Sequence, residues 1–259
     1  MSALPAGPRV RDPAPVDPAL VGAAETLAFL RRALPPVPGR LLEVGCGRGE
    51  VARGLLDLGW RVLAVECDAA AAAAARERGV DARDGSFPEV AEELAAAEPP
   101  FDALLFVRLL HHVPLDPCLA AVERLLRPGG LLLVEDYDWE RVDRATAEWA
   151  YGLLGAFAAA GLVPGEPWEA GGDALAAWRA RLSSEGLHSG ATLTAALRAR
   201  FDLLETGAAP YFHRYLARYL AGRPFAAEVA ARVLAGERAL VETGAIQPLG
   251  LRCVARRRG

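Results

Sequence analysis

A repeated succession of short apolar runs, each followed by a helix-forming stretch, is the feature of this sequence that most constrains its fold. Between Gly39 and Glu135 the succession repeats about five times. Parallel strands need crossover connections of this length, and a parallel sheet is covered by helices on both faces. The predicted strands are 41–44, 61–65, 80–83, 101–107 and 131–135, and the predicted helices are 51–58, 69–78, 88–97 and 117–126. The sequence therefore predicts an α/β fold with a doubly wound, mostly parallel sheet.

The pattern changes after the fifth predicted strand. Residues 140–200 contain helical stretches separated by Gly/Pro-rich loops, and no strand pattern. Two more strands, at 201–206 and 249–255, follow, with helices at 211–220 and 225–242 between them. A segment inserted here lies over the carboxyl edge of an open sheet, where ligands bind. We therefore expect a helical lid at about 140–200, inserted between strands five and six of a domain that spans 39–259.

The first 38 residues are expected to be a separate arm and helix. Residues 1–17 are rich in proline and small residues, which is typical of a loose segment. Asp17 is placed to cap a helix that opens with Pro18, and the prolines from Pro35 onward end that helix.

Composition excludes several classes of protein. The 259 residues are 53% hydrophobic, enough for one substantial core, and the net charge of −4 gives no strong attraction to nucleic acid. The four cysteines form no CxxC pair, so neither a metal centre nor a disulfide framework is predicted. No apolar run approaches the ~20 residues that span a bilayer, and the N-terminal segment has no signal-peptide core. We expect a cytoplasmic monomer or homodimer with no membrane partner.

A glycine-rich turn joins the first predicted strand to its helix, in the stretch LLEVGCGRGE at 41–50. Gly45 and Gly47 allow a tight turn and close approach of a ligand, and the helix behind them offers free N–H groups. A dinucleotide site would have a small residue where Glu50 stands. Glu43 and Glu50 suit a cation better than a diphosphate. S-adenosylmethionine (SAM), which carries an ammonium and a sulfonium, fits this turn.

Two further carboxylates end the second and third predicted strands. Glu66 stands 19 residues after Gly47 and can accept hydrogen bonds from both ribose hydroxyls, in SAM or in NAD. Asp84 can accept from an adenine amino group, and Gly85 lets the base lie close, although Asp–Gly is also a common turn pair. These positions predict a nucleoside ligand.

Three blocks, LLEVGCGRGE, FDALLFVRLLHHV and LAAVERLLRPGGLLLVED, occur in this order. With them the chain resembles the class I SAM-dependent methyltransferases, and within them the group that includes the ubiquinone/menaquinone-pathway methyltransferases. The resemblance covers about 39–136. It implies a Rossmann-like seven-stranded sheet of order 3-2-1-4-5-7-6 with the seventh strand antiparallel. It also implies that Arg108 lies beside the methionine moiety. The candidate cofactor-binding residues are Glu43, Gly45, Cys46, Gly47, Glu66, Cys67, Asp84, Gly85, Ser86 and Arg108.

Candidate catalytic and substrate-binding residues follow the later strands. His111 and His112 are placed at the carboxyl edge, where a histidine can act as general base, although the pair is also common in relatives with different substrates. The acids and aromatics after strands five and six can bind an acceptor or cap the lid. The tyrosines at 211, 215 and 219 also have the spacing of a packing stripe. The candidate substrate-binding residues are Glu135, Asp136, Tyr137, Trp139, Tyr211 and His213.

The sequence thus predicts a SAM-dependent methyltransferase with a small-molecule acceptor. Displacement at a sulfonium mainly requires the nucleophile, methyl and sulfur to be held in line, so O-, N- and C-methylation stay open. Two alternatives remain. A SAM-binding sensor or partner module would have a sealed acceptor pocket, and an NAD-dependent oxidoreductase is disfavoured by Glu50 and by the later blocks.

Overall fold

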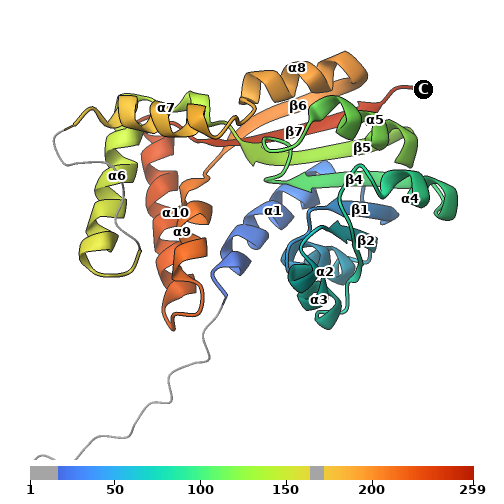
Figure 1. The fold of residues 1–259 in the computed structure, drawn as a ribbon, viewed down its shortest axis with the longest axis horizontal. Coiled ribbons are helices and arrows are strands. Elements are labelled where there is room, and N and C mark those ends of the chain that lie inside the picture. The colour runs from blue at the N-terminus through green and yellow to red at the C-terminus, as the bar shows by residue number, and fades with distance from the viewer. Residues whose placement is uncertain (1–16, 164–171) are drawn as a thin grey trace, which may run out of the picture.

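Seven strands form one sheet in the computed structural model, which describes residues 17–163 and 172–259. The order is β3-β2-β1-β4-β5-β7-β6, and β7 runs antiparallel to both β5 and β6 while the other neighbours pair in parallel (Figure 1). The strands are β1 (Arg40–Val44), β2 (Arg61–Glu66), β3 (Asp81–Asp84), β4 (Phe101–Val107), β5 (Leu126–Tyr137), β6 (Phe201–Ala209) and β7 (Gly250–Arg257). The doubly wound sheet and its implied order are confirmed.

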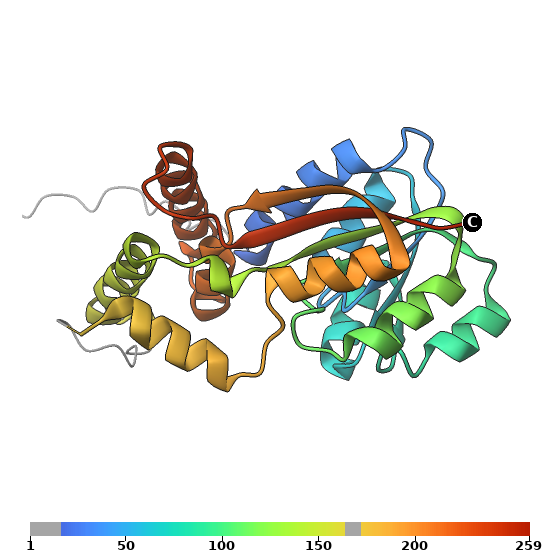
Figure 2. The ribbon, with the colours of Figure 1, turned by 90° about the horizontal axis from the view of Figure 1, so that it is seen from above.

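Helices cover both faces of this sheet (Figure 2). One face carries α4 (Ala91–Ala97), α5 (Leu115–Leu125) and α8 (Gly190–Arg200), and the other carries α1 (Ala19–Ala33), α2 (Glu50–Asp57) and α3 (Ala69–Glu77). Leu104 and Phe106 of β4 point into the first core, and Ala103 and Leu105 into the second. A strand buried on both faces reads as a continuous apolar run, which is why the sequence showed β4 so clearly.

Four helices form a third, separate core, and we call them the cap. They are α6 (Arg144–Ala159), α7 (Ala174–Ser184), α9 (Phe212–Leu220) and α10 (Ala226–Glu242). Trp178 of α7, Leu216 of α9 and Tyr137 at the end of β5 belong to this core. Figure 1 shows the cap to one side, at the carboxyl end of β5. No helix in the described ranges is long and apolar enough to cross a membrane.

The cap does not coincide with the expected lid. Leu193 and Leu197 of α8 share a core with Leu119 of α5, so α8 lies on the sheet although it falls within 140–200. The helices α9 and α10, which follow β6, join the cap instead. A helical pattern shows that a helix has an apolar face, but it does not show which surface that face will meet.

The structure describes only the second part of the expected N-terminal arm and helix. Residues 1–16 of the expected arm lie outside the described residues. Of the helix that follows, the carboxylate of Asp17 accepts a hydrogen bond from Ala19 N–H at 2.9 Å, as expected of a capping residue. The division at residue 38 stays a proposal, because α1 packs on α2 and contributes Phe29 and Leu30 to the core of the sheet.

Candidate active site

The glycine-rich turn after β1 adopts left-handed backbone angles. The φ angles of Gly45, Gly47 and Gly49 are +72°, +56° and +80°. A Cβ on Gly49 would lie 2.9 Å from Cβ of Ala75, so this glycine allows α2 and α3 to pack closely. A Cβ on Gly47 would meet no described atom within 4 Å. Gly47 therefore borders open space, as a ligand-facing residue should.

Glu66 at the end of β2 holds this turn in place. Its Oε2 accepts a hydrogen bond from Gly47 N–H at 2.8 Å, and its Oε1 accepts one from Asp68 N–H at 3.0 Å. Its Oε1 also contacts the Cys67 thiol at 3.6 Å, and since a carboxylate has about four acceptor sites, lone-pair capacity remains for a ligand. Asp84 stands beside Glu66 in the parallel register of β2 and β3, but it is exposed and paired with Arg76 at 3.1 Å.

Glu43 is a buried carboxyl with an unmet hydrogen-bonding need. Its side chain is 2% exposed, and its Oε2 has no hydrogen-bond partner among the described residues. Burial, followed by the nearby carboxylate of Glu50, raises the pKa of Glu43 to about 8. Glu50 itself lies 3.1 Å from Arg78. An unpartnered buried carboxyl is costly unless a ligand supplies a donor, and a ligand ammonium would supply both donors and charge.

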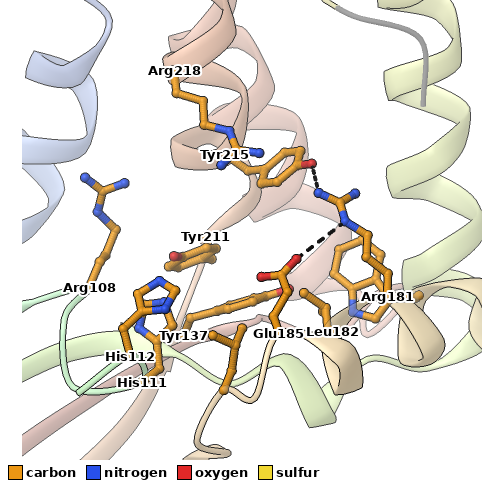
Figure 3. A pocket seen from close by; sticks show the side chains of 12 residues that line it. Arg108, His111, His112, Tyr137, Arg181, Leu182, Glu185, Tyr211, Tyr215 and Arg218 are labelled. Carbon is orange, nitrogen blue, oxygen red and sulfur yellow. Dashed lines mark hydrogen bonds and ion pairs between the residues drawn. The ribbon is translucent and has the colours of Figure 1, made fainter. Parts of the chain in front are cut away.

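Two cavities of about 320 Å³ each adjoin at the carboxyl edge of the sheet. The first, which we call the turn cavity, is lined by the glycine turn, Glu43, and Arg214 of α9. The second, the cap cavity, lies between the strand ends and the cap (Figure 3). Arg108 and Arg218 line both cavities. The cap cavity is lined by Arg108, His111, His112, Tyr137, Trp178, Arg181, Leu182, Glu185, Leu187, Tyr211, Tyr215 and Arg218.

Aromatic rings make much of the wall of the cap cavity. Tyr137 and Tyr211 are stacked, with ring centroids 4.4 Å apart and planes at 15°. The ring of His111 meets Tyr137 edge-on at 6.0 Å. Such a wall suits a flat, apolar ligand, and the histidine gives that wall a group that can accept a proton.

His111 is held by a buried carboxylate behind it. Nδ1 of His111 makes a short hydrogen bond with Oδ1 of Asp136, whose side chain is wholly buried. Asp136 also accepts from Tyr137 N–H at 2.8 Å and from His111 N–H at 3.3 Å. With Nδ1 engaged by a carboxylate, the tautomer that leaves Nε2 unprotonated is favoured, so Nε2 is the nitrogen that can act as a base.

His112 is less suited to that role. It is more exposed than His111, and the centroids of the two rings lie 3.9 Å apart. Partial burial, followed by the proximity of His111, lowers the pKa of His112. Of the expected catalytic pair, only His111 has a carboxylate partner among the described residues.

Three expected substrate-binding residues are placed elsewhere. Both oxygens of Glu135 are engaged, one by Arg214 and the other by Arg252 at 3.1 Å. His213 is buried beside Glu237, its Nδ1 3.4 Å from Oε2. Trp139 packs against the cap core. None of the three is among the described residues that line the cap cavity, and Asp136 acts through His111. Glu135 and His213 thus have ionic partners within the protein, whereas the contacts of Trp139 are apolar.

The two cysteines expected near the cofactor differ in environment. Cys46 lines the turn cavity, and burial raises the pKa of its thiol to about 12, which fits a packing role. Cys67 is exposed and its thiol contacts Glu66 at 3.6 Å. Gly85 N–H donates to the backbone oxygen of Glu66 at 3.0 Å, while the side chain of Ser86 is exposed.

Several lining residues of the cap cavity were not anticipated from sequence. Trp178, Arg181 and Glu185 come from the region of α7, and Arg218 comes from α9. In the sequence, the position of Tyr215 indicates only a packing stripe. The spacing within each helix does not indicate the cavity, because the cavity forms only where α7 and α9 come together over the ends of the strands.

The sheet order and the glycine turn define a Rossmann-like, nucleoside-binding class of protein. The family described as "Methyltransferase domain" matches residues 22–159, more than half of the chain. The chain therefore belongs to the class I SAM-dependent methyltransferases, and its cofactor is SAM. Membership in this family removes the oxidoreductase alternative.

Named relatives and solved structures agree with this family. The chain is 34% identical over 146 residues to the ubiquinone biosynthesis O-methyltransferase of Xanthomonas axonopodis pv. citri, covering 53% of this chain and 57% of that protein. It is 30% identical over 143 residues to the protein of the same name from Xylella fastidiosa, covering 53% and 56%. The chain thus matches only about half the length of these curated relatives.

Solved structures share the fold over most of the chain. The S-adenosylmethionine dependent methyltransferase from Mesorhizobium loti superposes with a TM-score of 0.55 at 22% identity, over 92% of this chain and all of that one. The PH0226 protein from Pyrococcus horikoshii also has a TM-score of 0.55, at 15% identity, over 92% and 91% of the two chains. At these identities the likeness shows the fold alone.

Proposed function

We propose that the protein transfers the methyl group of SAM to an oxygen of a small-molecule acceptor in the cap cavity, with His111 as the general base. The observation that carries this proposal is the junction of the two cavities at Arg108 and Arg218, with His111 on the acceptor side and the buried Asp136 behind it. The relatives described above are named as O-methyltransferases, which favours oxygen over nitrogen or carbon as the atom that is methylated.

The residues around the turn cavity fit the chemical groups of SAM. The unpartnered Oε2 of Glu43 suits the ammonium, and the oriented carboxylate of Glu66 suits the ribose hydroxyls. Asp84 is assigned to the adenine amino group. In the free protein its carboxylate forms an exposed ion pair with Arg76, which must be shared with adenine or broken when SAM binds. Arg108 is assigned to the methionine carboxylate. When bound, SAM supplies a methyl group already activated on a sulfonium.

The chain's own contribution is to place the acceptor and to remove a proton. The hydroxyl of the acceptor gives its proton to Nε2 of His111 as the oxygen attacks, and the carboxylate of Asp136 stabilises the resulting imidazolium. Asp136 is a positioning residue, because it touches only His111 and neighbouring backbone among the described groups. Holding the two reactants in one orientation supplies much of the rate enhancement.

Replacement of His111 tests this role. We expect His111→Ala to lower kcat for a hydroxyaromatic acceptor by about 100-fold or more, the usual contribution of a general base. Binding of S-adenosylhomocysteine should change little, and added imidazole should restore part of the rate. Asp136→Asn should lower kcat while KM for the acceptor changes less. Full turnover by His111→Ala would contradict the assignment.

A SAM-binding module without catalysis is the second candidate. It would be favoured by an acceptor site that is closed by side chains, whereas the cap cavity has a volume of about 320 Å³ and an aromatic wall. The net charge of −4 supports a small molecule over nucleic acid as acceptor. Cytoplasmic location and a monomeric or dimeric state stay predictions.

A further inference from the structure

Positive charge is concentrated in the cap cavity. Among its described lining residues are three arginines, Arg108, Arg181 and Arg218, against one carboxylate, that of Glu185. The chain as a whole carries a net charge of −4, so the excess at this place runs against the average of the molecule. The three guanidinium groups come from the end of β4, from α7 and from α9, and they converge only in the folded protein.

Two of these groups share one aromatic ring. Cζ of Arg218 lies 4.5 Å from the ring centroid of Tyr215, and Cζ of Arg181 lies 5.4 Å from it. Arg181 is also bonded to the Tyr215 hydroxyl and lies 3.8 Å from Glu185. Arg181 and Arg218 therefore lie at the same end of the cavity, where an anionic ligand can receive N–H donors from them.

Arg218 has no ion pair with any carboxylate in the described part of the chain. Its guanidinium group instead donates a hydrogen bond to the hydroxyl of Tyr219 and lies over the Tyr215 and Tyr219 rings. Arg108 likewise has no carboxylate partner within residues 17–163 and 172–259. SAM brings a single carboxylate, which Arg108 is placed to receive, so the exposed guanidinium of Arg218 is available to bind a second anion.

The arginines of α7 and α9 and the proposed base, His111, lie at different ends of the cap cavity. In Figure 3, Arg218, Tyr215 and Arg181 lie toward one end, His111 and His112 lie toward the other, and Tyr211 lies between them. The volume of about 320 Å³ is at the small end of the range for ligand sites, which suits a compact ring. A flat ligand against the aromatic wall would present one end to the arginines and the other to His111.

We propose that the acceptor is an aromatic hydroxy compound that carries an anionic group, a carboxylate or a phosphate, bound by Arg218 together with Arg181. This inference rests on the proposed function and adds the substrate class to it. The anionic group orients the ring so that its hydroxyl faces His111. Guanidinium groups suit both oxyanions, because their N–H donors match carboxylate and phosphate oxygens.

Matched ligand pairs test the charge requirement. The full chain, saturated with S-adenosylhomocysteine, would be titrated calorimetrically with 3,4-dihydroxybenzoate and with 3,4-dihydroxybenzamide, which differ in charge but hardly in shape. A second pair, 4-hydroxyphenyl phosphate and hydroquinone, tests the phosphate. We expect the anion of at least one pair to bind about tenfold or more tightly than its neutral partner, as for a charge-assisted hydrogen bond, and the pair that shows the preference identifies the anion.

Variants assign the preference to the arginines. Arg218→Gln and Arg181→Gln should each reduce it several-fold, and Arg179→Gln, an exposed residue of the same helix as Arg181 that is not among the described cavity residues, should leave it unchanged. Equal affinity within both pairs, or binding of no compound, would overturn the inference. So would a preference that survives both cavity variants.

The initial titration with S-adenosylhomocysteine keeps the two proposals apart. Its binding supports the cofactor site whatever the ligand pairs show. Failure of the chain to bind it would instead count against the proposed function itself.

Discussion

At the scale of single residues, Glu43 links cofactor binding to proton release. Its raised pKa, about 8 against an ordinary 4.5, means that the carboxyl is protonated at pH 7 in the free protein. A ligand ammonium and sulfonium favour the carboxylate and lower this pKa, so binding should expel the proton.

The expected release is up to about one proton per SAM bound at pH 7, because a single carboxyl changes its state. Calorimetric titration in two buffers of different ionisation enthalpy measures it. Glu43→Gln should bind more weakly and release almost none. Equal enthalpies for the natural chain in both buffers would show that Glu43 does not change its protonation state on binding.

Glu43 also affects stability as pH changes. Its pKa is raised on folding, so the folded state holds the proton more tightly than the unfolded state between pH 4.5 and about 8. The free energy of unfolding contributed by this group therefore falls as pH rises through that window. We expect the difference in Tm between Glu43→Gln and the natural chain to grow in favour of the variant from pH 5 to pH 8, by scanning calorimetry without ligand. A constant difference would contradict the raised pKa.

Glu66 is expected to contribute more to cofactor affinity than its neighbours do. It combines two backbone hydrogen bonds that orient it with free lone pairs for the ribose. Glu66→Ala should weaken SAM binding about tenfold or more, since a hydrogen bond to a charged group is lost. Glu77→Ala, an exposed carboxylate on α3, is the matched control and should bind normally. Unchanged affinity in Glu66→Ala would remove the ribose assignment.

At the scale of elements, α9 depends on a carboxylate from α10. Tyr211 precedes the first turn of α9 and provides no side-chain cap of its own. Oε1 of the buried Glu237 accepts hydrogen bonds from Tyr211 N–H at 2.6 Å and Phe212 N–H at 3.0 Å, and Oε2 accepts one from His213 N–H at 3.3 Å. A negative charge at a helix N-terminus also stabilises the helix dipole.

Loss of this contact should destabilise the cap and the acceptor site together, because α9 carries Tyr215 and Arg218. We expect Glu237→Ala to lower the free energy of unfolding by about 2 kcal/mol or more, since three backbone donors at the start of α9 lose their acceptor. Chemical denaturation measures this, and Glu242→Ala at the exposed end of α10 is the control. A Glu237→Ala chain as stable as the natural one would show that water or another group replaces the carboxylate.

At the scale of the whole molecule, the sequence predicted the sheet better than the cap. The strands of a parallel sheet are buried on both faces, so β1, β2 and β4 appear as apolar runs with local boundaries. The order of the strands followed from the resemblance rather than from periodicity. The distribution of α6 to α10 between the cap and the sheet depends on contacts distant in sequence, and no local pattern records them.

The cofactor-binding and acceptor-binding parts of the candidate site also differ in how well the sequence predicted them. Glu43, Gly47 and Glu66 lie within one strand–turn–helix unit and its neighbour, so their spacing predicted a nucleoside site. Arg181 and Arg218 lie 37 positions apart on two helices of unremarkable pattern. Glu135 and His213 were predicted to bind substrate because they are titratable residues near strand ends. Such residues can equally pair within the protein, and both of these do.

The position to which the methyl group of SAM is transferred is the most direct test of the proposed O-methyl transfer. The full chain would be incubated with SAM labelled in its methyl carbon and with a set of hydroxyaromatic acids, and the products analysed by NMR. We expect a labelled methoxy group on a hydroxyl of the acceptor, formed by the natural chain and nearly absent with His111→Ala. Label on nitrogen or ring carbon, or SAM binding with no transfer to any member of the set, would contradict the proposed O-methyl transfer.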